Sequence, residues 1–123
     1  MSEVVPRRVD KPWGWELVWA ETDKYAGKLI FVRAGEALSL QLHEVKEESW
    51  LVREGRALLE LGSAEDELEE REVVAGEAYH LLPGTIHRLT AVEDTLVIEV
   101  STAQLDDVVR LEDLYGREGT TAP

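Results

Sequence analysis

The chain has 123 residues, the usual size of one domain, so we expect a single domain over residues 1–123. Its formal net charge of −13 argues against nucleic acid or an anionic membrane surface as a partner, because both bind clustered Lys and Arg. The sequence offers no apolar run of the roughly 18 residues that span a bilayer and no signal-peptide core, so we expect a cytoplasmic protein. Because it has no cysteine, any metal must be held by nitrogen and oxygen ligands. Nine Arg against four Lys and the absence of Asn suggest a thermophilic source.

Short β-rich segments separated by turn signals recur along the chain, a pattern typical of an all-β sandwich or barrel. In chain order, the predicted strands cover residues 15–19, 28–32, 38–43, 49–53, 57–61, 72–74, 79–82, 88–92 and 96–100. The acidic stretch 63–70 is interpreted as a solvated hairpin loop. Residues 106–115 predict a short C-terminal helix, since an Asp pair stands at its start and Gly116 follows its end. We expect residues 118–123 to be a disordered tail.

The predicted strand at 38–43 alternates three leucines with Ser39, Gln41 and His43. One interpretation places the leucines in the core and the polar side chains in water. The other places Gln41 and His43 inside a barrel, so that the leucines need cover from a terminal segment or a second subunit. A homodimer is the natural expectation of the second interpretation.

Two further residues extend this polar face toward a metal site. Glu48 lies at the start of the next strand, and His87 follows the Pro83-Gly84 turn. The candidate ligands are therefore Gln41, His43, Glu48 and His87. Two imidazoles, one carboxylate and one amide oxygen suit Zn²⁺, Mn²⁺, Fe²⁺, Co²⁺ or Ni²⁺. Each of these residues taken alone is more often an ordinary polar group than a ligand.

The same residues stand in two motifs that resemble those of the cupins. The first motif is matched in every spacing by Gly35, Gln41, His43, Glu48 and Gly55, with Gln in place of the first cupin His. The second is matched at Gly76, Gly84 and His87, whereas Leu82 and Ala91 stand at its Pro and Asn positions. The resemblance implies an all-β cupin fold, a double-stranded β-helix or jelly-roll barrel, here with a short C-terminal helix.

Four ordered segments resemble a narrower family, the type II mannose-6-phosphate isomerase domain, which also forms the C-terminal part of bifunctional mannose-1-phosphate guanylyltransferases. These segments are Lys11-Pro12-Trp13-Gly14, Leu38 to His43, the run with Lys46, Glu48 and Trp50, and Val109 to Arg117. The likeness covers about residues 10–117. It implies one divalent metal, zinc by first choice, held by Gln41, His43, Glu48 and His87. The implied reaction converts mannose 6-phosphate into fructose 6-phosphate, with a small sugar phosphate as the only partner besides a second subunit.

This isomerisation needs a base that moves a proton between C2 and C1. His80, Lys28 and Tyr79 are the candidates, although a structural role for His80 is also open. The candidates for binding phosphate are the nearby cations Lys46, Arg88, Arg110 and Arg117. Arg110 and Arg117 match the closing segment of the family, whereas Lys46 replaces an Arg and offers only a point charge.

Two other functional classes remain open at the level of the sequence. One is a different metal-dependent cupin enzyme, such as a dioxygenase or another sugar isomerase or epimerase. The other is a non-catalytic cupin that binds a sugar or another metabolite, because fold does not fix function.

Overall fold

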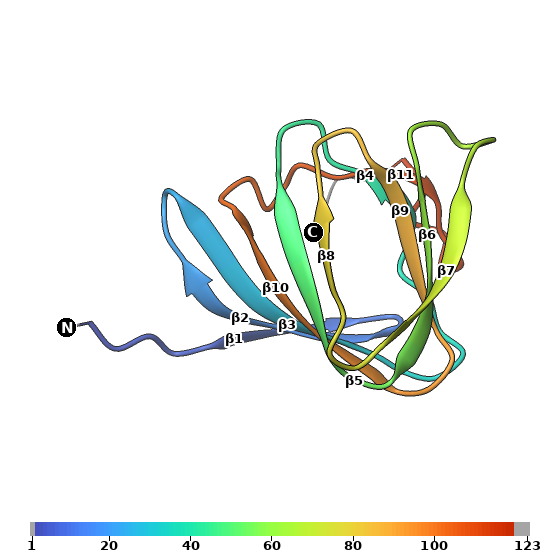
Figure 1. The fold of residues 1–123 in the computed structure, drawn as a ribbon. Coiled ribbons are helices and arrows are strands. Elements are labelled where there is room, and N and C mark those ends of the chain that lie inside the picture. Colours follow the sequence, from blue (N-terminus) through green and yellow to red (C-terminus); the bar gives the residue numbers. More distant parts are fainter. Residues whose placement is uncertain (1, 120–123) are drawn as a thin grey trace.

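The chain forms a curved barrel of β-strands, seen in the computed structural model, which describes residues 2–119 (Figure 1). Eleven strands occur in this range: β1 Arg7–Lys11, β2 Gly14–Glu21, β3 Tyr25–Val32, β4 Leu40–Leu42, β5 Glu48–Glu54, β6 Arg56–Gly62, β7 Glu69–Val74, β8 Ala78–Leu81, β9 Ile86–Ala91, β10 Thr95–Thr102 and β11 Val109–Glu112. The predicted all-β class and the jelly-roll barrel are confirmed.

The strands form two antiparallel sheets that face each other across the barrel interior. Sheet A has the order β1-β2-β3-β10-β5-β8, and sheet B has the order β11-β4-β9-β6-β7. Neighbours in both sheets are often distant in sequence, as in the pairing of β3 with β10. A barrel of this kind places side chains of alternate parity inside and outside.

Period-two patterns explain why these segments become strands. In β10 the side chains of Val97, Glu99 and Ser101 are buried, whereas Leu96, Ile98 and Val100 point outward and are at least partly exposed. Several of the tight turns between these strands contain a glycine with a positive φ. Gly55 has a φ of 95°, and a Cβ atom there would lie 2.2 Å from the Asp94 carbonyl oxygen. This turn therefore needs glycine, which explains the last residue of the first motif.

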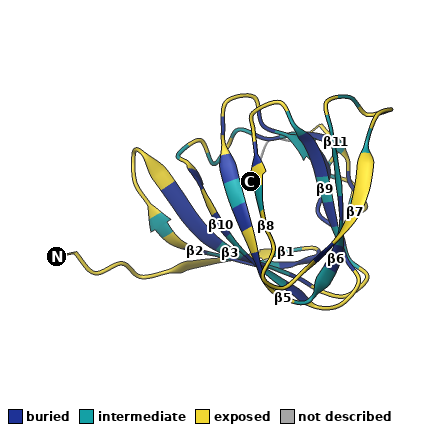
Figure 2. Cartoon of the chain, in the orientation of Figure 1, coloured by how far each residue is buried: buried dark blue, intermediate teal, exposed yellow. Residues whose placement is uncertain are grey.

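The hydrophobic core fills one part of the barrel and leaves another part for polar groups. Val32, Val52, Leu59, Leu89 and Val97 belong to this core and are fully buried. Figure 2 shows buried segments along the strands of both sheets, with the exposed residues concentrated in the loops and on β7. The polar part of the interior carries the buried residues described below.

The predicted helix over residues 106–115 is wrong. Residues 109–112 form β11, which pairs with β4, and no helix occurs among residues 2–119, so none in this range is long and apolar enough to cross a membrane. Val108 and Arg110 are buried, while Val109 and Leu111 are only partly so, which is the alternation of a strand. The open edge of β4 satisfies the backbone of this segment better than a short isolated helix would.

Other expectations differ in detail from the structure. β1 at Arg7–Lys11 was not predicted, because its charged residues give no apolar period. The acidic loop covers residues 63–68, since Glu69 and Glu70 already belong to β7. Residues 120–123 of the predicted disordered tail lie outside the described part of the chain. At its beginning, the Gly119 amide donates a hydrogen bond to the Arg110 carbonyl.

The strand around Leu40 buries both of its faces. Leu38 and Leu40 are 6% and 1% exposed, while Ser39 and His43 are 2% and 5% exposed. Ser39, Gln41 and His43 line a cavity inside the barrel, as the second interpretation of this strand predicts. Leu38 and Leu40 are covered within the chain, so they give no reason for a second subunit.

Candidate metal centre

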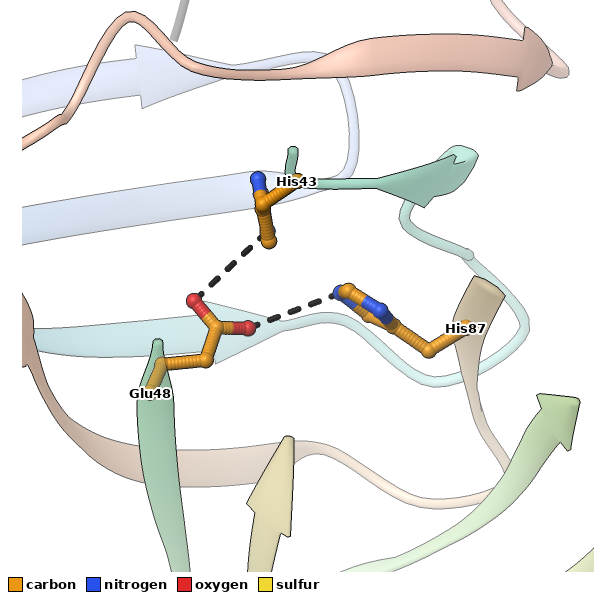
Figure 3. Close-up of side chains that lie close together, drawn as sticks. All are labelled: His43, Glu48 and His87. Atoms are coloured by element: carbon orange, nitrogen blue, oxygen red, sulfur yellow. Dashed lines mark ion pairs between the residues drawn. The ribbon is translucent and has the colours of Figure 1, made fainter. Parts of the chain in front are cut away.

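Three buried side chains from both sheets converge inside the barrel. His43 follows β4, Glu48 begins β5, and His87 lies on β9 (Figure 3). The Glu48 carboxylate lies 3.6 Å from His43 Nε2 through one oxygen and 3.5 Å from His87 Nε2 through the other. One ligand atom from each residue lies within 4.8 Å of the other two. Two ligands of one tetrahedral zinc ion are separated by roughly 3.4 Å, so these separations suit a shared cation.

Backbone carbonyls fix the orientation of both imidazole rings. The Nδ1 atom of His43 bonds to the Asp107 carbonyl, and that of His87 bonds to the Thr85 carbonyl at 3.0 Å. Because a carbonyl only accepts, each Nδ1 carries the proton, and each Nε2 presents a lone pair toward Glu48. Metal-binding histidines are held by this same kind of contact.

The atoms that face one another in this cluster are all acceptors. His43 Nε2, His87 Nε2 and Glu48 Oε1 are buried without a hydrogen-bond partner in the described part of the chain, whereas Glu48 Oε2 lies 3.0 Å from Lys46 Nζ. Burial lowers the pKa of His87 and disfavours a proton as the bridging charge. Buried acceptors of this kind need a cation, so the residues present fit a divalent metal ion.

Gln41 lies beside this cluster through the pairing of sheet B. Arg110 on β11 is opposite Gln41 on β4, and Gln41 is opposite His87 on β9. Directly opposite residues of antiparallel strands point to the same face, so the three form one inward row. The Gln41 oxygen Oε1 accepts a hydrogen bond of 2.8 Å from Ser39 Oγ. Gln41 is thereby held next to the three clustered residues.

A second row of buried polar residues crosses sheet A. Lys28, Glu99 and Trp50 are directly opposite one another on β3, β10 and β5. The Trp50 indole donates a hydrogen bond of 3.1 Å to Glu99. The Trp50 and His87 rings pack edge to face, with their centroids 5.6 Å apart. The rows of the two sheets therefore touch at the metal cluster.

Lysines bridge the carboxylates of this second row. Lys28 Nζ lies 3.0 Å from Glu16 and 3.6 Å from Glu99, and Lys46 Nζ lies 3.0 Å from Glu48 and 3.9 Å from Glu99. Neutralising any one of these buried groups would leave the charge of its partner buried without a counter-charge. A continuous network thus links the metal cluster to the opposite wall of the barrel.

This network separates the pKa values of two neighbouring carboxyl groups. Burial alone raises the pKa of Glu48. His43, Lys46 and His87 outweigh burial and hold this pKa well below its usual range. Burial and the nearby Glu48 charge raise the pKa of Glu99 to about 7. Burial opposes the charge of Lys28, yet Glu99 and Glu16 raise its pKa above the ordinary value. Glu48 is therefore ionised as a ligand must be, and Glu99 is able to exchange a proton near neutrality.

Two adjoining cavities give access to the cluster. The inner cavity, of about 50 Å³, is lined by His43, Gln41, Trp50 and Glu99 among others. The outer cavity, of about 730 Å³, lies between β1 to β3 and the loop 103–107. Lys11, Glu16, Lys28 and Leu105 line both. Together they offer the volume that small-molecule sites commonly have.

The three candidates for the base lie in different places. Lys28 lines the inner cavity, but it is held by two carboxylates. His80 on β8 is exposed and lies 3.0 Å from Glu47 and 3.2 Å from Ser49. Tyr79 packs against the hydrophobic core. Neither His80 nor Tyr79 is among the residues lining the inner cavity.

The four candidates for binding phosphate divide in the same way. Lys46, Arg110 and Arg117 line the inner cavity. Arg88 does not; its guanidinium forms two hydrogen bonds of 2.8 and 3.2 Å to Glu60 and lies 3.5 Å from Glu112. Arg88 therefore has the structural role of joining β9, β6 and β11.

Sequence reasoning assigned no site role to Glu16, Glu99, Lys11 or Asp107, although Lys11 opens one of the segments that resemble the family. The signal for Glu16 and Glu99 is a lone acidic residue at the buried parity of an otherwise apolar strand. The Asp107 carboxylate accepts backbone hydrogen bonds from Glu44, Val45 and Lys46 at 2.7 to 3.0 Å. No local sequence pattern predicts these hydrogen bonds, because Asp107 is more than sixty residues away from its three partners in the sequence.

Two antiparallel sheets closed around a buried His-Glu-His cluster define the class of protein: the chain has the cupin fold. It belongs to the family described as mannose-6-phosphate isomerase C-terminal, whose pattern matches residues 2–113. The sequence resemblance is therefore confirmed both for the cupin fold and for the narrower family.

Relatives and structural neighbours agree with this assignment. The chain is 38% identical over 117 residues to a mannose-1-phosphate guanylyltransferase of Escherichia coli strain K12, covering 92% of this chain and 24% of that protein. It thus spans about a quarter of the length of the curated relatives that it matches.

Solved structures with low sequence identity share the fold. Capsular polysaccharide assembling protein CapF from Staphylococcus aureus aligns with a TM-score of 0.73 and 18% identity, over 88% of this chain and 32% of that chain. KdgF from Halomonas sp. aligns with a TM-score of 0.72 and 23% identity, over 86% of this chain and 98% of that chain. At these identities the likeness concerns the fold and not the reaction.

Proposed function

We propose that this chain is a metal-dependent aldose–ketose isomerase that converts mannose 6-phosphate into fructose 6-phosphate. The observation that carries the proposal is the convergence of His43 Nε2 and His87 Nε2 on the Glu48 carboxylate, where both nitrogens and Glu48 Oε1 are buried without hydrogen-bond partners among the described residues. Membership of the family supports the choice of reaction and sugar. Both remain proposals, because the relatives are about four times as long as this chain.

In this proposal Gln41, His43, Glu48 and His87 hold one divalent ion, with zinc as first choice and Mn²⁺, Fe²⁺, Co²⁺ or Ni²⁺ as alternatives. The ion supplies Lewis acidity that stabilises negative charge on the sugar oxygens. The amide of Gln41 is a neutral and weaker ligand than imidazole. It therefore leaves the site more ready to exchange water for a substrate oxygen.

We propose Glu99 as the base that carries the proton between carbons. The reaction moves one hydrogen from C2 to C1 and one proton from O2 to O1. Glu99 lines the inner cavity, is 3% exposed, and is fixed by the Trp50 indole. Its pKa of about 7 matches the requirement that a base act near neutral pH. Lys28, whose pKa is raised, stays charged and orients Glu99.

A coupled assay on the purified protein tests this function. We expect conversion of mannose 6-phosphate that a chelator abolishes and a divalent ion restores. Protein that carries metal but gives no conversion would refute the proposed reaction. Oxygen consumption with Fe²⁺ would indicate an oxygenase instead, and thermal stabilisation by a sugar without turnover would indicate a binding protein.

A further inference from the structure

A second group of reactive side chains lies on the outer face of sheet A. Ser49 on β5 is directly opposite His80 on β8, the strand at the edge of this sheet (Figure 1). Glu48 and Trp50, the neighbours of Ser49 in β5, are buried inside the barrel, so Ser49 and His80 point to the opposite face. Neither of them is among the residues lining the inner cavity. The group is therefore separate from the metal centre.

Three side chains of this group form a relay of contacts. Ser49 Oγ lies 3.2 Å from His80 Nδ1, and His80 Nε2 lies 3.0 Å from a carboxylate oxygen of Glu47. Because a carboxylate only accepts, Nε2 carries the proton of the neutral ring, and Nδ1 has the lone pair that accepts the Ser49 hydroxyl. A serine, a histidine and an acid in this order activate the serine as a nucleophile. Compared with the serine proteases, the two ring nitrogens have exchanged places.

Backbone pairing fixes the parts of the chain that carry this relay. The Glu47 amide donates a hydrogen bond of 3.1 Å to Thr102 Oγ1, and the Glu47 carbonyl accepts one of 3.0 Å from the Thr102 amide. Ser49 lies in β5, which pairs with β8 on one side and with β10 on the other. The nucleophile, the base and the acid are therefore held in mutual positions by the sheet, as a catalytic group requires.

A pocket of about 270 Å³ gives a ligand access to the relay. Glu47, Ser49 and His80 line it, together with Tyr25 and Thr102 among others. Tyr25 is 54% exposed, and its phenol can donate a hydrogen bond to the negative charge that develops on a carbonyl oxygen. The pocket is smaller than most sites for drug-sized ligands, so it suits a short acyl group.

The same residues do not form a second metal site. Among residues 2–119, only His43, Glu48 and His87 come together as a group of three potential ligands. His80 has Glu47 as its acidic neighbour, and one imidazole with one carboxylate is fewer than the three or four protein ligands of a zinc site. The contacts favour a nucleophile over a bound ion.

We propose that Ser49, His80 and Glu47 form a second active site that hydrolyses small activated esters. Ser49 Oγ forms a bond to the ester carbonyl carbon while its proton passes to His80 Nδ1. The bond between that carbon and the alkoxy oxygen breaks, and His80 gives the proton to the leaving alcohol. Water then attacks the acyl-serine with His80 as base, which releases the carboxylic acid and restores Ser49. Glu47 is a positioning residue that holds the tautomer of the ring.

Reaction of the full chain with p-nitrophenyl acetate tests this site. We expect a burst of nitrophenolate and an acetyl group on Ser49, located by mass spectrometry of peptides. Ser49→Ala should abolish both, and His80→Gln should slow the burst about 10²-fold to 10⁴-fold because it removes the base. Glu47→Gln should slow the burst less than His80→Gln does, and Glu47→Asp should recover part of that loss. Glu44→Gln changes an exposed acid of the same loop and is the matched control, with the burst unchanged.

Several results would overturn the site. Equal hydrolysis in the wild type and Ser49→Ala, or acetyl groups on other residues alone, would show that the serine is not the nucleophile. A wild-type burst in His80→Gln would remove the base. Metal-bound hydroxide also hydrolyses esters, so a burst that a chelator abolishes would refute the site as well. The position of the acetyl group in the wild type decides the matter even if a variant fails to fold, and none of these results depends on isomerase activity.

Discussion

Two carboxylates of the interior differ through their partners. Glu48 faces two imidazoles and Lys46, whereas Glu99 is fully enclosed and lies near the Glu48 charge. The first group is stabilised as an anion, and the second is held near its titration point. This division of roles between neighbouring acids is typical of active sites.

Replacing Glu99 tests its assignment as the base. We expect Glu99→Gln to lower kcat about 10²-fold to 10⁴-fold, because a positioned base contributes that much, while bound metal stays unchanged. The measurement is the coupled isomerase assay with metal analysis of the same sample. Glu60→Gln, which alters a carboxylate paired with Arg88 outside the cavity, is the control. Equal activity in Glu99→Gln and the wild type would remove Glu99 from the reaction.

The pH dependence of the reaction follows from the same residue. Only the ionised carboxylate accepts a proton, so activity is lost below the pKa of Glu99 and rises as pH increases through it. That pKa is about 7, and a cation bound at Glu48 lowers it. We therefore expect kcat/KM to rise with pH with a midpoint near or below pH 7, and to level off above that midpoint. An identical acidic limb in Glu99→Gln, at constant metal content, would contradict this origin.

At the residue scale, the sequence predicted the ligands better than their surroundings. His43, Glu48 and His87 stood at motif spacings, and the structure brings them together. Glu99 was missed because both faces of β10 carry apolar residues, so a lone acidic residue in this strand does not by itself show that it points inward. Only the pairing with Lys28 and Trp50 defines which face is inside.

At the scale of elements, the segment 103–112 does more than close the sheet. It lines both cavities through Leu105, supplies Arg110, and contacts His43 through the Asp107 carbonyl. Of the Asp pair that suggested a helix start, Asp107 instead fixes the loop between β4 and β5. An Asp side chain can accept hydrogen bonds from any free backbone amides, and not only from those of a helix that it begins. Asp107 accepts them from the amides of residues 44–46, which are distant in the sequence.

Asp107 should therefore position the metal site without touching it. We expect Asp107→Ala to weaken metal affinity about 10-fold to 100-fold, the usual loss when the support of a ligand is removed. Three amides in the loop would lose their acceptor. The backbone at residue 107, whose carbonyl holds His43, would then be less firmly anchored. Metal affinity can be measured by competition with a chromophoric chelator.

The adjacent residue offers a control for that substitution. Asp106 is exposed, and among residues 2–119 only its backbone carbonyl is engaged, in a hydrogen bond from the Val108 amide. We expect Asp106→Ala to keep the metal affinity of the wild type. If both substitutions have the same effect, the loss reflects the charge of the loop and not the contacts of Asp107.

At the scale of the whole molecule, the outer face of sheet A is apolar. Nine side chains from β2, β3, β5 and β10 form it: Trp15, Leu17, Trp19, Leu29, Phe31, Leu51, Leu96, Ile98 and Val100. Trp19, Leu51 and Val100 are 42%, 40% and 49% exposed. An apolar face of this extent is typical of an interface, and a second copy of the same face matches it in polarity.

The expected homodimer can be tested on this face. We expect the wild type to have twice the chain mass of 13.9 kDa and Leu51→Lys with Val100→Lys to halve it, because two charges would be buried. Light scattering after size exclusion measures the mass. Val74→Lys, at a comparably exposed site on β7 in sheet B, is the control. A monomeric wild type, or a dimer that survives both substitutions, would contradict this interface.

The barrel itself was predictable because turn glycines and period-two strands repeat along the chain. The charged β1 and the strand β11 were not, because both depend on pairing with neighbours that the local sequence does not reveal. The same limit applies to the buried network, in which Lys28 joins Glu16 to Glu99, far apart in the sequence. Tertiary pairing, and not local pattern, assembles the site.

Metal titration of the chelator-treated protein, with mannose 6-phosphate conversion followed at each step, tests the central claim most directly. The account predicts that activity appears in proportion to bound metal and saturates at one ion per chain. Glu48→Gln should bind little metal and show no activity. Uptake of one ion per chain without any formation of fructose 6-phosphate would contradict the account.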